Sequence, residues 1–256
     1  MHARKRFGQH FLHDESVLDR IVTALSPRAT DHLVEIGPGR GALTRALLAE
    51  DCATLDAIEI DRDLVPRLRD ELAGEPRFTL HESDALDFDF TALARQRGAR
   101  LRIVGNLPYN ISTPLLFHVL DHAEAIDDLH IMLQREVVAR IAASPGSGDY
   151  GRLTIMLSPW LTAETLFDVG PGAFHPPPKV WSAVVRLTVR RQPAFPVNAR
   201  FASVVAAAFS HRRKTLRNAL KGVVSAEQMA ACQVDPNARP ETLAPEAFNR
   251  LAQALG

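Results

Sequence analysis

The sequence predicts an α/β fold, a Rossmann-like sheet of seven mostly parallel strands followed by a small all-helical C-terminal domain. Through residues 1–190, short apolar runs typical of buried strands alternate with amphipathic helical patterns. Such alternation builds a parallel sheet with right-handed crossovers. Residues 191–256 carry helical patterns and no strand signal. We therefore expect two domains, divided at residue 190.

Seven segments are expected to form the strands, and the last of them is expected to run antiparallel. They are His32–Ile36, Thr54–Glu59, Arg77–Leu80, Leu101–Val104, Leu129–Leu133, Thr165–Val169 and Val180–Val189. Helices are expected over Glu15–Leu25, Ala42–Ala49, Arg62–Leu72, Thr113–Asp121 and Gln134–Ile141, and a further one opens at Tyr150. The C-terminal domain is expected to hold helices Arg200–Phe209, Lys214–Lys221, Ala226–Cys232 and Pro245–Leu255.

Composition excludes several classes of protein. The 256 residues are 46% apolar, which supports a sizeable core. No apolar run approaches the roughly 18 residues that a membrane helix needs. Cys52 and Cys232 stand far apart and form no metal or redox pair, so a cytoplasmic setting is expected. His118 and His122 have zinc spacing but no third ligand nearby, and we expect no metal.

A glycine-rich turn follows the first strand, at Gly37-Pro38-Gly39-Arg40-Gly41. Glycines there allow a tight turn and a close approach of backbone to a ligand. The G-x-G-x-G spacing is a variant used by S-adenosylmethionine enzymes, although an ordinary structural turn is nearly as compatible with it. Glu59 ends the next strand, about 20 residues on, where a doubly wound sheet places a carboxylate on ribose hydroxyls. Asp84 follows the third strand, beside the same crevice.

A second notable stretch, Asn106-Leu107-Pro108-Tyr109, lies between a strand and a helix. The Asn106 side-chain carbonyl and the Leu107 backbone carbonyl can accept hydrogen bonds from a planar amine. Pro108 stiffens the turn, and Tyr109 offers a face on which a base can stack. On its own, the stretch is better explained as an ordinary strand–turn–helix connection in which Asn106 and Pro108 only make the turn.

These four residues resemble the N-P-P-Y-type motif of methyltransferases that act on exocyclic amines. Leu107 in second place, with Asn110-Ile111-Ser112 after it, resembles the ribosomal RNA adenine N6-dimethyltransferases. Other segments match the same family: an R-F-G-Q-N/H-F-L arm at 6–12, L-Q-K/R-E-V at 133–137, F-x-P-P-P-K-V-x-S-A-V-V at 174–185 and R-R-K-T-L/I-R-N at 212–218. The resemblance covers nearly the whole chain and favours the bacterial small-subunit type.

The resemblance implies a class I methyltransferase sheet and a reaction. Family members transfer four methyl groups from S-adenosylmethionine to two adjacent adenosines near the 3′ end of 16S rRNA, within the assembling 30S subunit. It implies that Asn106, Leu107, Pro108 and Tyr109 position the target adenine, with Phe174 on its other face. The residues expected to contact the methyl donor are His10, Leu12, Gly37, Gly39, Glu59, Asp84 and Asn106.

The same resemblance implies that basic residues hold the RNA. They are Arg4, Lys5 and Arg6 of the N-terminal arm, and Arg212, Arg213, Lys214, Arg217 and Lys221 of the C-terminal domain. Arg213, Arg217 and Lys221 are spaced i, i+4, i+8 and are therefore expected to share one helical face. A monomer without a protein partner and without a membrane contact is expected.

Three alternatives stay open at this point. A large-subunit rRNA dimethylase of the antibiotic-resistance type shares the donor site and the Asn106 motif, but Gly39-Arg40-Gly41-Ala42-Leu43-Thr44 and Pro176-Pro177-Pro178-Lys179-Val180 favour the small-subunit type. A DNA adenine methyltransferase usually has a second proline where Leu107 stands. An assembly or transcription factor could keep the fold without the activity, which the intact Asn106, Glu59 and Asp84 argue against.

Overall fold

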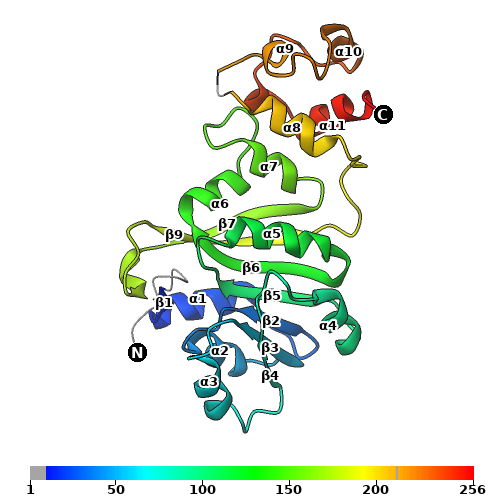
Figure 1. The fold of residues 1–256 in the computed structure, drawn as a ribbon. Helices are drawn as coiled ribbons and strands as arrows, with labels where there is room; N and C mark the ends of the chain where they lie inside the picture. Colours follow the sequence, from blue (N-terminus) through cyan, green and yellow to red (C-terminus); the bar gives the residue numbers. More distant parts are fainter. Residues whose placement is uncertain (1–9, 212) are drawn as a thin grey trace. The chain divides into compact units, whose positions relative to one another are not determined.

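The chain forms two compact units in this computed structural model, which describes residues 10–211 and 213–256 (Figure 1). The first unit runs up to Val138 and from Ala163 to Val189. The second holds Ala139–Thr162 and Arg190–Gly256. The proposed RNA contacts Arg4, Lys5, Arg6 and Arg212 lie outside the described residues.

This division differs from the expected one at residue 190 because the segment 139–162 groups with the C-terminal helices. Tyr150 and Ile155, both from that segment, are buried in the second unit's core beside Phe201 and Phe248. The tyrosine hydroxyl also donates to the Leu243 carbonyl at 2.7 Å. Apolar burial and this hydrogen bond explain why the segment leaves the sheet unit.

The main sheet of the first unit has seven strands, as predicted, in the order β4-β3-β2-β5-β6-β9-β7. The strands are β2 (His32–Ile36), β3 (Thr54–Glu59), β4 (Phe78–Glu82), β5 (Leu101–Asn106), β6 (Ile126–Gln134), β7 (Leu161–Val169) and β9 (Ser182–Val189). β2 to β6 pair in parallel, and β9 pairs antiparallel with β6, which confirms the expected antiparallel strand.

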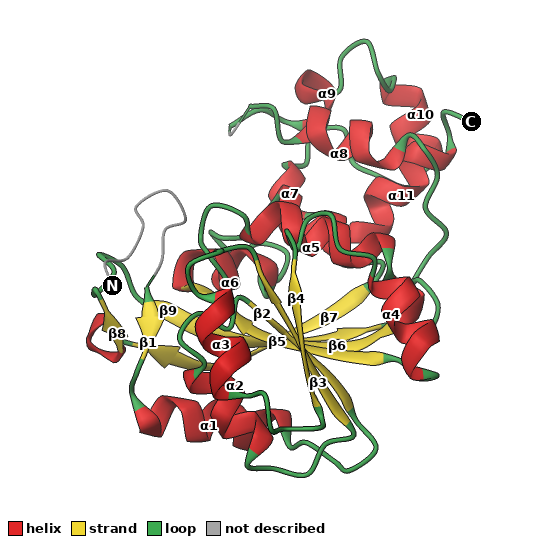
Figure 2. Ribbon diagram, turned by 60° about the horizontal axis from the view of Figure 1, so that its bottom comes forward, coloured by secondary structure: helices red, strands yellow, loops and turns green. Residues whose placement is uncertain are grey.

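Helices cover both faces of this sheet (Figure 2). They are α1 (Glu15–Leu25), α2 (Ala42–Leu48), α3 (Val65–Glu71), α4 (Phe90–Arg97), α5 (Ser112–Asp121) and α6 (Arg135–Ile141). Asp14 caps α1, because its Oδ1 accepts from the backbone N–H groups of Ser16 and Val17. The apolar stripe of α1 packs with α2 on one face, in a cluster that includes Leu33 and Leu55.

Strand β2 stands where the strand order reverses, since β3 lies on one side of it and β5 on the other. The carboxyl ends of the strands at such a point form the crevice where doubly wound sheets bind ligands. The pairing of β5 with β2 depends on a glycine at position 105. A Cβ on Gly105 would lie 2.5 Å from the carbonyl oxygen of Ile36, so only glycine fits there.

A small two-stranded ribbon closes one side of that crevice. β1 (Phe11–Leu12) pairs antiparallel with β8 (Phe174–His175), in the register Phe11 to His175 and Leu12 to Phe174. His13 N–H donates to the Ala173 carbonyl at 3.0 Å, and Nδ1 of the His10 ring lies 2.8 Å from the Pro176 carbonyl. The N-terminal segment is therefore docked on the sheet unit from residue 10 onward.

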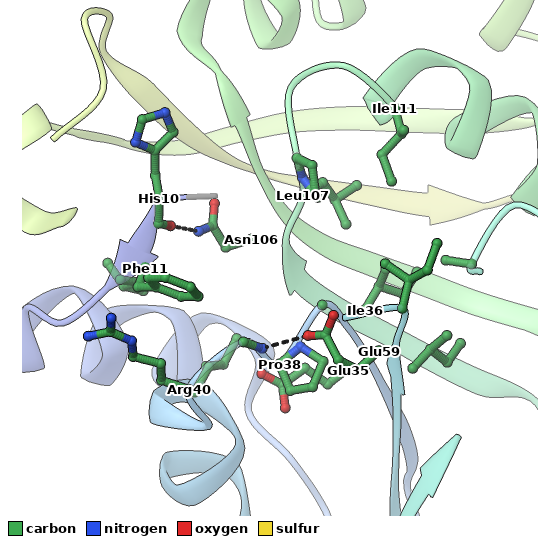
Figure 3. A pocket seen from close by; sticks show the side chains of 18 of the residues that line it. His10, Phe11, Glu35, Ile36, Pro38, Arg40, Glu59, Asn106, Leu107 and Ile111 are labelled. Carbon is green, nitrogen blue, oxygen red and sulfur yellow. Dashed lines mark hydrogen bonds between the residues drawn. The ribbon is translucent and has the colours of Figure 1, made fainter. Parts of the chain in front are cut away.

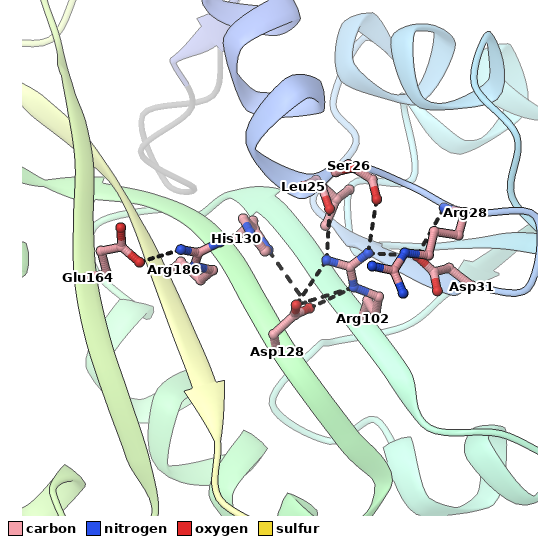
Figure 4. Close-up of polar contacts among 9 residues, drawn as sticks. All are labelled: Leu25, Ser26, Arg28, Asp31, Arg102, Asp128, His130, Glu164 and Arg186. Carbon is pink, nitrogen blue, oxygen red and sulfur yellow. Dashed lines mark hydrogen bonds and ion pairs between the residues drawn. The ribbon is translucent and has the colours of Figure 1, made fainter.

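The amino ends of the strands, opposite the crevice, carry an ionic network around Arg102 (Figure 4). Its guanidinium donates to Asp128 at 2.9 Å, to Asp31 at 2.6 Å and to the Leu25 carbonyl at 2.8 Å. These bonds join the end of α1 to the starts of β2, β5 and β6. The neighbouring His130 is 1% exposed, and Asp128 lies 3.8 Å from its ring.

The second unit is helical, as predicted. It holds α7 (Arg152–Leu157), α8 (Phe201–Ala208), α9 (Leu216–Ala219), α10 (Ala226–Ala231) and α11 (Pro245–Gln253). The expected helix Lys214–Lys221 is shorter than its pattern indicates, because extended backbone at Thr215 precedes α9 and Gly222 adopts φ +81°. Arg213 and Lys221 lie outside α9, so the predicted shared helical face of Arg213, Arg217 and Lys221 is wrong.

No helix among the described residues is long and apolar enough to cross a membrane.

Candidate active site

A cavity of about 320 Å³ opens at the carboxyl ends of β2, β3, β4 and β5 (Figure 3). That volume is in the range of small-molecule sites. Every residue predicted to contact the donor or the target base lines it, with the exception of Phe174. They are His10, Leu12, Gly37, Gly39, Glu59, Asp84, Asn106, Leu107, Pro108 and Tyr109.

The floor of the cavity is the glycine turn between β2 and α2. Gly39 adopts φ +58°, and a Cβ there would lie 3.1 Å from the ring of Phe11. The turn therefore requires glycine both for its backbone and for the docked N-terminal segment. The Arg40 guanidinium lies over the Phe11 ring, 4.5 Å from its centroid, and this cation–π contact helps to hold the ring against the turn (Figure 3).

Glu59 ends β3 and fixes the turn from the side. Its Oε2 accepts from Gly39 N–H at 3.1 Å and its Oε1 accepts from Asp61 N–H at 2.9 Å. Glu59 is only 4% exposed, and burial raises the pKa of its carboxyl, opposed by these two hydrogen bonds. A carboxylate offers about four lone-pair sites, so two oxygens already bonded once can still accept from ligand hydroxyls.

Two lining residues were not anticipated from the sequence. Glu35, near the end of β2, is 2% exposed and accepts from Thr44 Oγ1 at 2.6 Å. Burial raises the pKa of Glu35 to about 7. Ile60 directly follows Glu59, lines the cavity and is 45% exposed. Its place after a strand end, next to Glu59, was the signal that could have marked it as a lining residue.

The acidic groups of the cavity suit a cationic ligand that also carries hydroxyls and a flat apolar ring. Glu35, Glu59 and Asp84 supply carboxyl groups, while Ile60 and Ala85 supply apolar surface. Oδ1 of Asp84 accepts from Leu86 N–H at 2.9 Å, which orients the carboxylate beside the cavity. Carboxylates in fixed positions stabilise nearby positive charge and accept from hydroxyl and amine donors.

The Asn106 side chain is held in one orientation. Its Nδ2 donates to the backbone carbonyl of His10 at 2.9 Å (Figure 3). Since the amide nitrogen is used by the N-terminal segment, the amide oxygen is the atom available to accept from a ligand. Leu107 N–H donates to the Met132 carbonyl at 3.2 Å, which ties the loop after β5 to β6.

Tyr109 lines the same cavity, with its ring 5.8 Å from the His10 ring and tilted by 32°. Its hydroxyl lies 2.8 Å from the Ser182 hydroxyl. Burial raises the pKa of the Tyr109 phenol, so it stays protonated at neutral pH. An aromatic ring beside a hydrogen-bond acceptor is the arrangement that a nucleobase site needs.

Phe174 is placed differently from our expectation. It is 2% exposed, belongs to the apolar core under α1, and does not line the cavity. Its register partner Leu12 packs in the same core. In this conformation the ring stabilises the docking of the N-terminal segment and offers no face to a base.

Basic residues of the second unit lie on its surface. Arg213, Lys214, Arg217 and Lys221 are all exposed. Arg213 and Lys214 precede Thr215, Arg217 lies within α9, and Lys221 follows that helix. Exposed cations with long side chains can reach phosphates from such positions, although they do not follow one helix face.

Comparison with known proteins agrees with this geometry. A family model described as ribosomal RNA adenine dimethylase matches residues 1–256. The ribosomal RNA small subunit methyltransferase A of Pseudomonas aeruginosa is 56% identical over 255 residues, which are 99% of this chain and 94% of that protein. The protein of the same name from Hahella chejuensis is 50% identical over 252 residues, 98% and 92% of the two chains.

Two solved structures are similar over nearly the whole chain. The 23S rRNA methyltransferase ErmE has a TM-score of 0.73 at 28% identity, covering 96% of this chain and 99% of its own. A dimethyladenosine transferase from Plasmodium falciparum has a TM-score of 0.79 at 24% identity, covering 94% and 96%. The fold class predicted from the sequence, a methyltransferase sheet with a helical C-terminal part, is confirmed.

Proposed function

The chain belongs to the ribosomal RNA adenine dimethylase family, and from this membership we propose how its cavity performs the reaction. It is an enzyme that transfers methyl groups from S-adenosylmethionine to the N6 amines of two adjacent adenosines near the 3′ end of 16S rRNA. The small-subunit substrate follows from relatives that are half identical or more over the full length. The similarity to a 23S rRNA enzyme is much lower.

One observation supports the assignment of the cavity above all others. The loop that carries Asn106 and the glycine turn braced by Glu59 open into the same space. A donor site and an acceptor for an amine therefore adjoin, as direct transfer between two bound molecules requires.

We assign the donor to the part of the cavity around Gly37, Gly39, Glu59 and Asp84. S-adenosylmethionine supplies a methyl group already activated by a positive sulfonium. Glu59 is assigned to the ribose hydroxyls and Asp84 to the adenine amine, while Ile60 contacts the adenine ring. The buried Glu35 adds negative potential near the donor's positive charges. His10 and Leu12 close the cavity from the docked N-terminal segment.

Asn106 is assigned to the target base. Its Oδ1 and the Leu107 carbonyl accept the two amine hydrogens and direct the nitrogen toward the donor. Pro108 stiffens this loop, and Tyr109 stacks on the ring. The adenine must leave its stack to enter, at a cost of a few kcal/mol. Positioning and electrostatics supply the rate, and we assign no general base and no metal to the reaction.

RNA binding is assigned to the basic residues outside the cavity. In the second unit these are Arg213, Lys214, Arg217 and Lys221. Arg212 and the arm residues Arg4, Lys5 and Arg6 complete the proposed set. Phosphate contacts by such residues dominate affinity and carry little sequence information. We propose that the substrate is the assembling 30S subunit, met in the cytoplasm by a monomer of this chain.

The test is methylation of small subunits that lack these methyl groups. Subunits from a strain in which the gene is deleted are incubated with the purified protein and methyl-labelled S-adenosylmethionine. Primer extension should then stop at two adjacent adenosines near the 3′ end of 16S rRNA. The absence of these stops would refute the proposed function, and so would label in 23S rRNA when large subunits are supplied in place of the small ones.

A further inference from the structure

We propose that Ser182 is a positioning residue whose hydroxyl fixes the ring of Tyr109 for stacking on the target adenine. This inference rests on the function proposed above, in which Tyr109 receives the base. The two hydroxyl oxygens lie 2.8 Å apart. Ser182 is completely buried, whereas Tyr109 lines the cavity. The bond therefore anchors a cavity side chain to the protein interior.

Ser182 is well suited to serve as the anchor because its own position is set by the sheet. It is the first residue of β9 and pairs with Gln134, the last residue of β6. The carbonyl of the preceding residue, Trp181, accepts from Arg135 N–H at 3.0 Å, at the start of α6. These backbone bonds fix the main chain at Ser182, and its complete burial restricts the rotation of the side chain.

Tyr109, in contrast, lies on the connection between β5 and α5. Its backbone is braced locally, since its carbonyl accepts from Ser112 Oγ at 3.1 Å. Backbone bracing alone leaves the side chain a choice of staggered χ1 rotamers, which carry the ring to different places. The hydrogen bond at the far end of the ring selects one of them, because the hydroxyl oxygen lies on the long axis of the ring. The direction of that axis decides where on the ring a base can stack.

The role predicts a specific defect, and not merely a slower reaction. The free amine offers two hydrogens, to Asn106 Oδ1 and the Leu107 carbonyl. After the first transfer only one hydrogen is left, so one of these two bonds is lost. Stacking on Tyr109 then contributes a larger share of the positioning. A Tyr109 ring whose position is no longer fixed should impair the second transfer more than the first.

The experiment compares Ser182→Ala, Tyr109→Phe and the double variant, with Thr188→Ala, an exposed hydroxyl on the same strand, as the control. Each variant is assayed separately over a time course, and mass spectrometry counts the methyl groups on each adenosine. Both single variants should raise the ratio of monomethyl to dimethyl product several-fold. The double variant should be no worse than either, since all three lack the same bond. Tyr109→Phe breaks the bond without touching the sheet, in case Ser182→Ala folds poorly.

Fluorine NMR of the protein without RNA gives a second, independent test of the Ser182–Tyr109 bond. The chain has two tyrosines, Tyr109 and Tyr150, so 3-fluorotyrosine labelling gives two fluorine resonances, assigned with Tyr109→Phe. Ser182→Ala should shift or broaden the Tyr109 resonance and leave the Tyr150 resonance in place. A purely structural serine would lower the melting temperature without changing the product ratio.

The outcomes separate the two proposals. An active wild type whose product ratio is unchanged by Ser182→Ala, or whose single effects add in the double variant, overturns the role of Ser182 alone. A wild type that methylates no small-subunit RNA overturns the proposed function together with this role.

Discussion

Asn106 and His10 are joined by a hydrogen bond of 2.9 Å from the side-chain amide nitrogen to a backbone carbonyl. The bond links the loop after β5 to the N-terminal segment, 96 residues away in the sequence. It also decides which end of the amide faces the cavity. An acceptor fixed before the substrate arrives loses little entropy on binding, which is the general advantage of a preorganised site.

The first prediction concerns this amide. Asn106→Ala removes the acceptor, and Asn106→Asp replaces the donor to His10 by an anion that its carbonyl repels. Both variants should abolish dimethyladenosine formation, counted by mass spectrometry, while binding to small subunits persists. His10→Ala keeps the backbone carbonyl and should be milder. Near-normal dimethylation by Asn106→Ala would show that the proposed amine acceptor is wrong.

The second prediction concerns Glu59. Glu59→Gln places an amide N–H₂ opposite one of two backbone donors, so donor affinity and stability should both fall. We expect affinity for S-adenosylmethionine to decrease by about 1.5–3 kcal/mol, as for hydrogen bonds to a charged group. The stability loss follows from the burial of Glu59, which is only 4% exposed.

The control is Glu82→Gln. Glu82 ends the neighbouring strand in register with Glu59 but is exposed. It should change neither calorimetric affinity nor melting temperature. Equal effects of the two substitutions would remove Glu59 from the donor site.

The third prediction concerns pH and Glu35. Its folded pKa of about 7 lies above the ordinary value of 4.5. The native state therefore keeps a proton that the unfolded state has released, and stability should fall as pH rises from 4.5 to 7, by on the order of 3 kcal/mol. Glu35→Gln should flatten this part of the pH dependence of chemical denaturation.

Donor binding supplies a second readout for Glu35. A positive ligand favours the ionised carboxyl, so binding near pH 6 should release a proton. Calorimetry in buffers of different ionisation enthalpy measures that release directly. Its disappearance in Glu35→Gln is expected, and equal proton release by wild type and variant would assign the effect to another group.

The fourth prediction concerns His130, whose titration makes stability fall as pH drops. Burial lowers the pKa of His130 to about 4 from an ordinary value of 6.5, although Asp128 lies 3.8 Å away. Between pH 6.5 and 4, the imidazole of His130 is protonated in the unfolded state and neutral in the native state. Stability should therefore fall as pH drops from 6.5 to 4, by on the order of 3 kcal/mol. His130→Leu should remove this loss in denaturant melts, whereas His13→Gln, at an exposed histidine, should not.

The fifth prediction concerns the exposed cations of the second unit. Replacing Arg213, Arg217 and Lys221 by Gln should weaken binding to small subunits and lower the salt dependence of that affinity. The log–log slope should decrease by about one for each phosphate that the variant no longer neutralises. Arg95→Gln, an exposed cation on α4, is the control. An unchanged slope in the triple variant would mean that these residues only face solvent.

Much of the sheet unit could be predicted because periodic patterns reflect burial. Every predicted strand exists, and the glycine turn, Glu59, Asp84 and Asn106 do meet at one edge. Parallel strands bring their carboxyl ends together, so residues far apart in the chain could be placed in one site from the sequence.

The errors have physical causes of their own. β1 and β8 have two residues each, too few for any periodicity, so the burial of Phe174 between them could not be foreseen. The helix pattern around Lys214 overlooked the extended backbone at Thr215 and the left-handed conformation of Gly222. Contacts that depend on three-dimensional packing, such as that of Gly105 with Ile36, leave no periodic signal at all.

The chain enters the second unit twice, at 139–162 and again from residue 190. During synthesis, the segment with Tyr150 therefore emerges before β9, and its core partners Phe201 and Phe248 emerge only afterwards. Neither unit is a contiguous piece of the gene. A recombination that exchanged only the region after residue 190 between relatives would separate Tyr150 and Ile155 from the partners they evolved with. Swaps that keep the enzyme folded should carry both segments together.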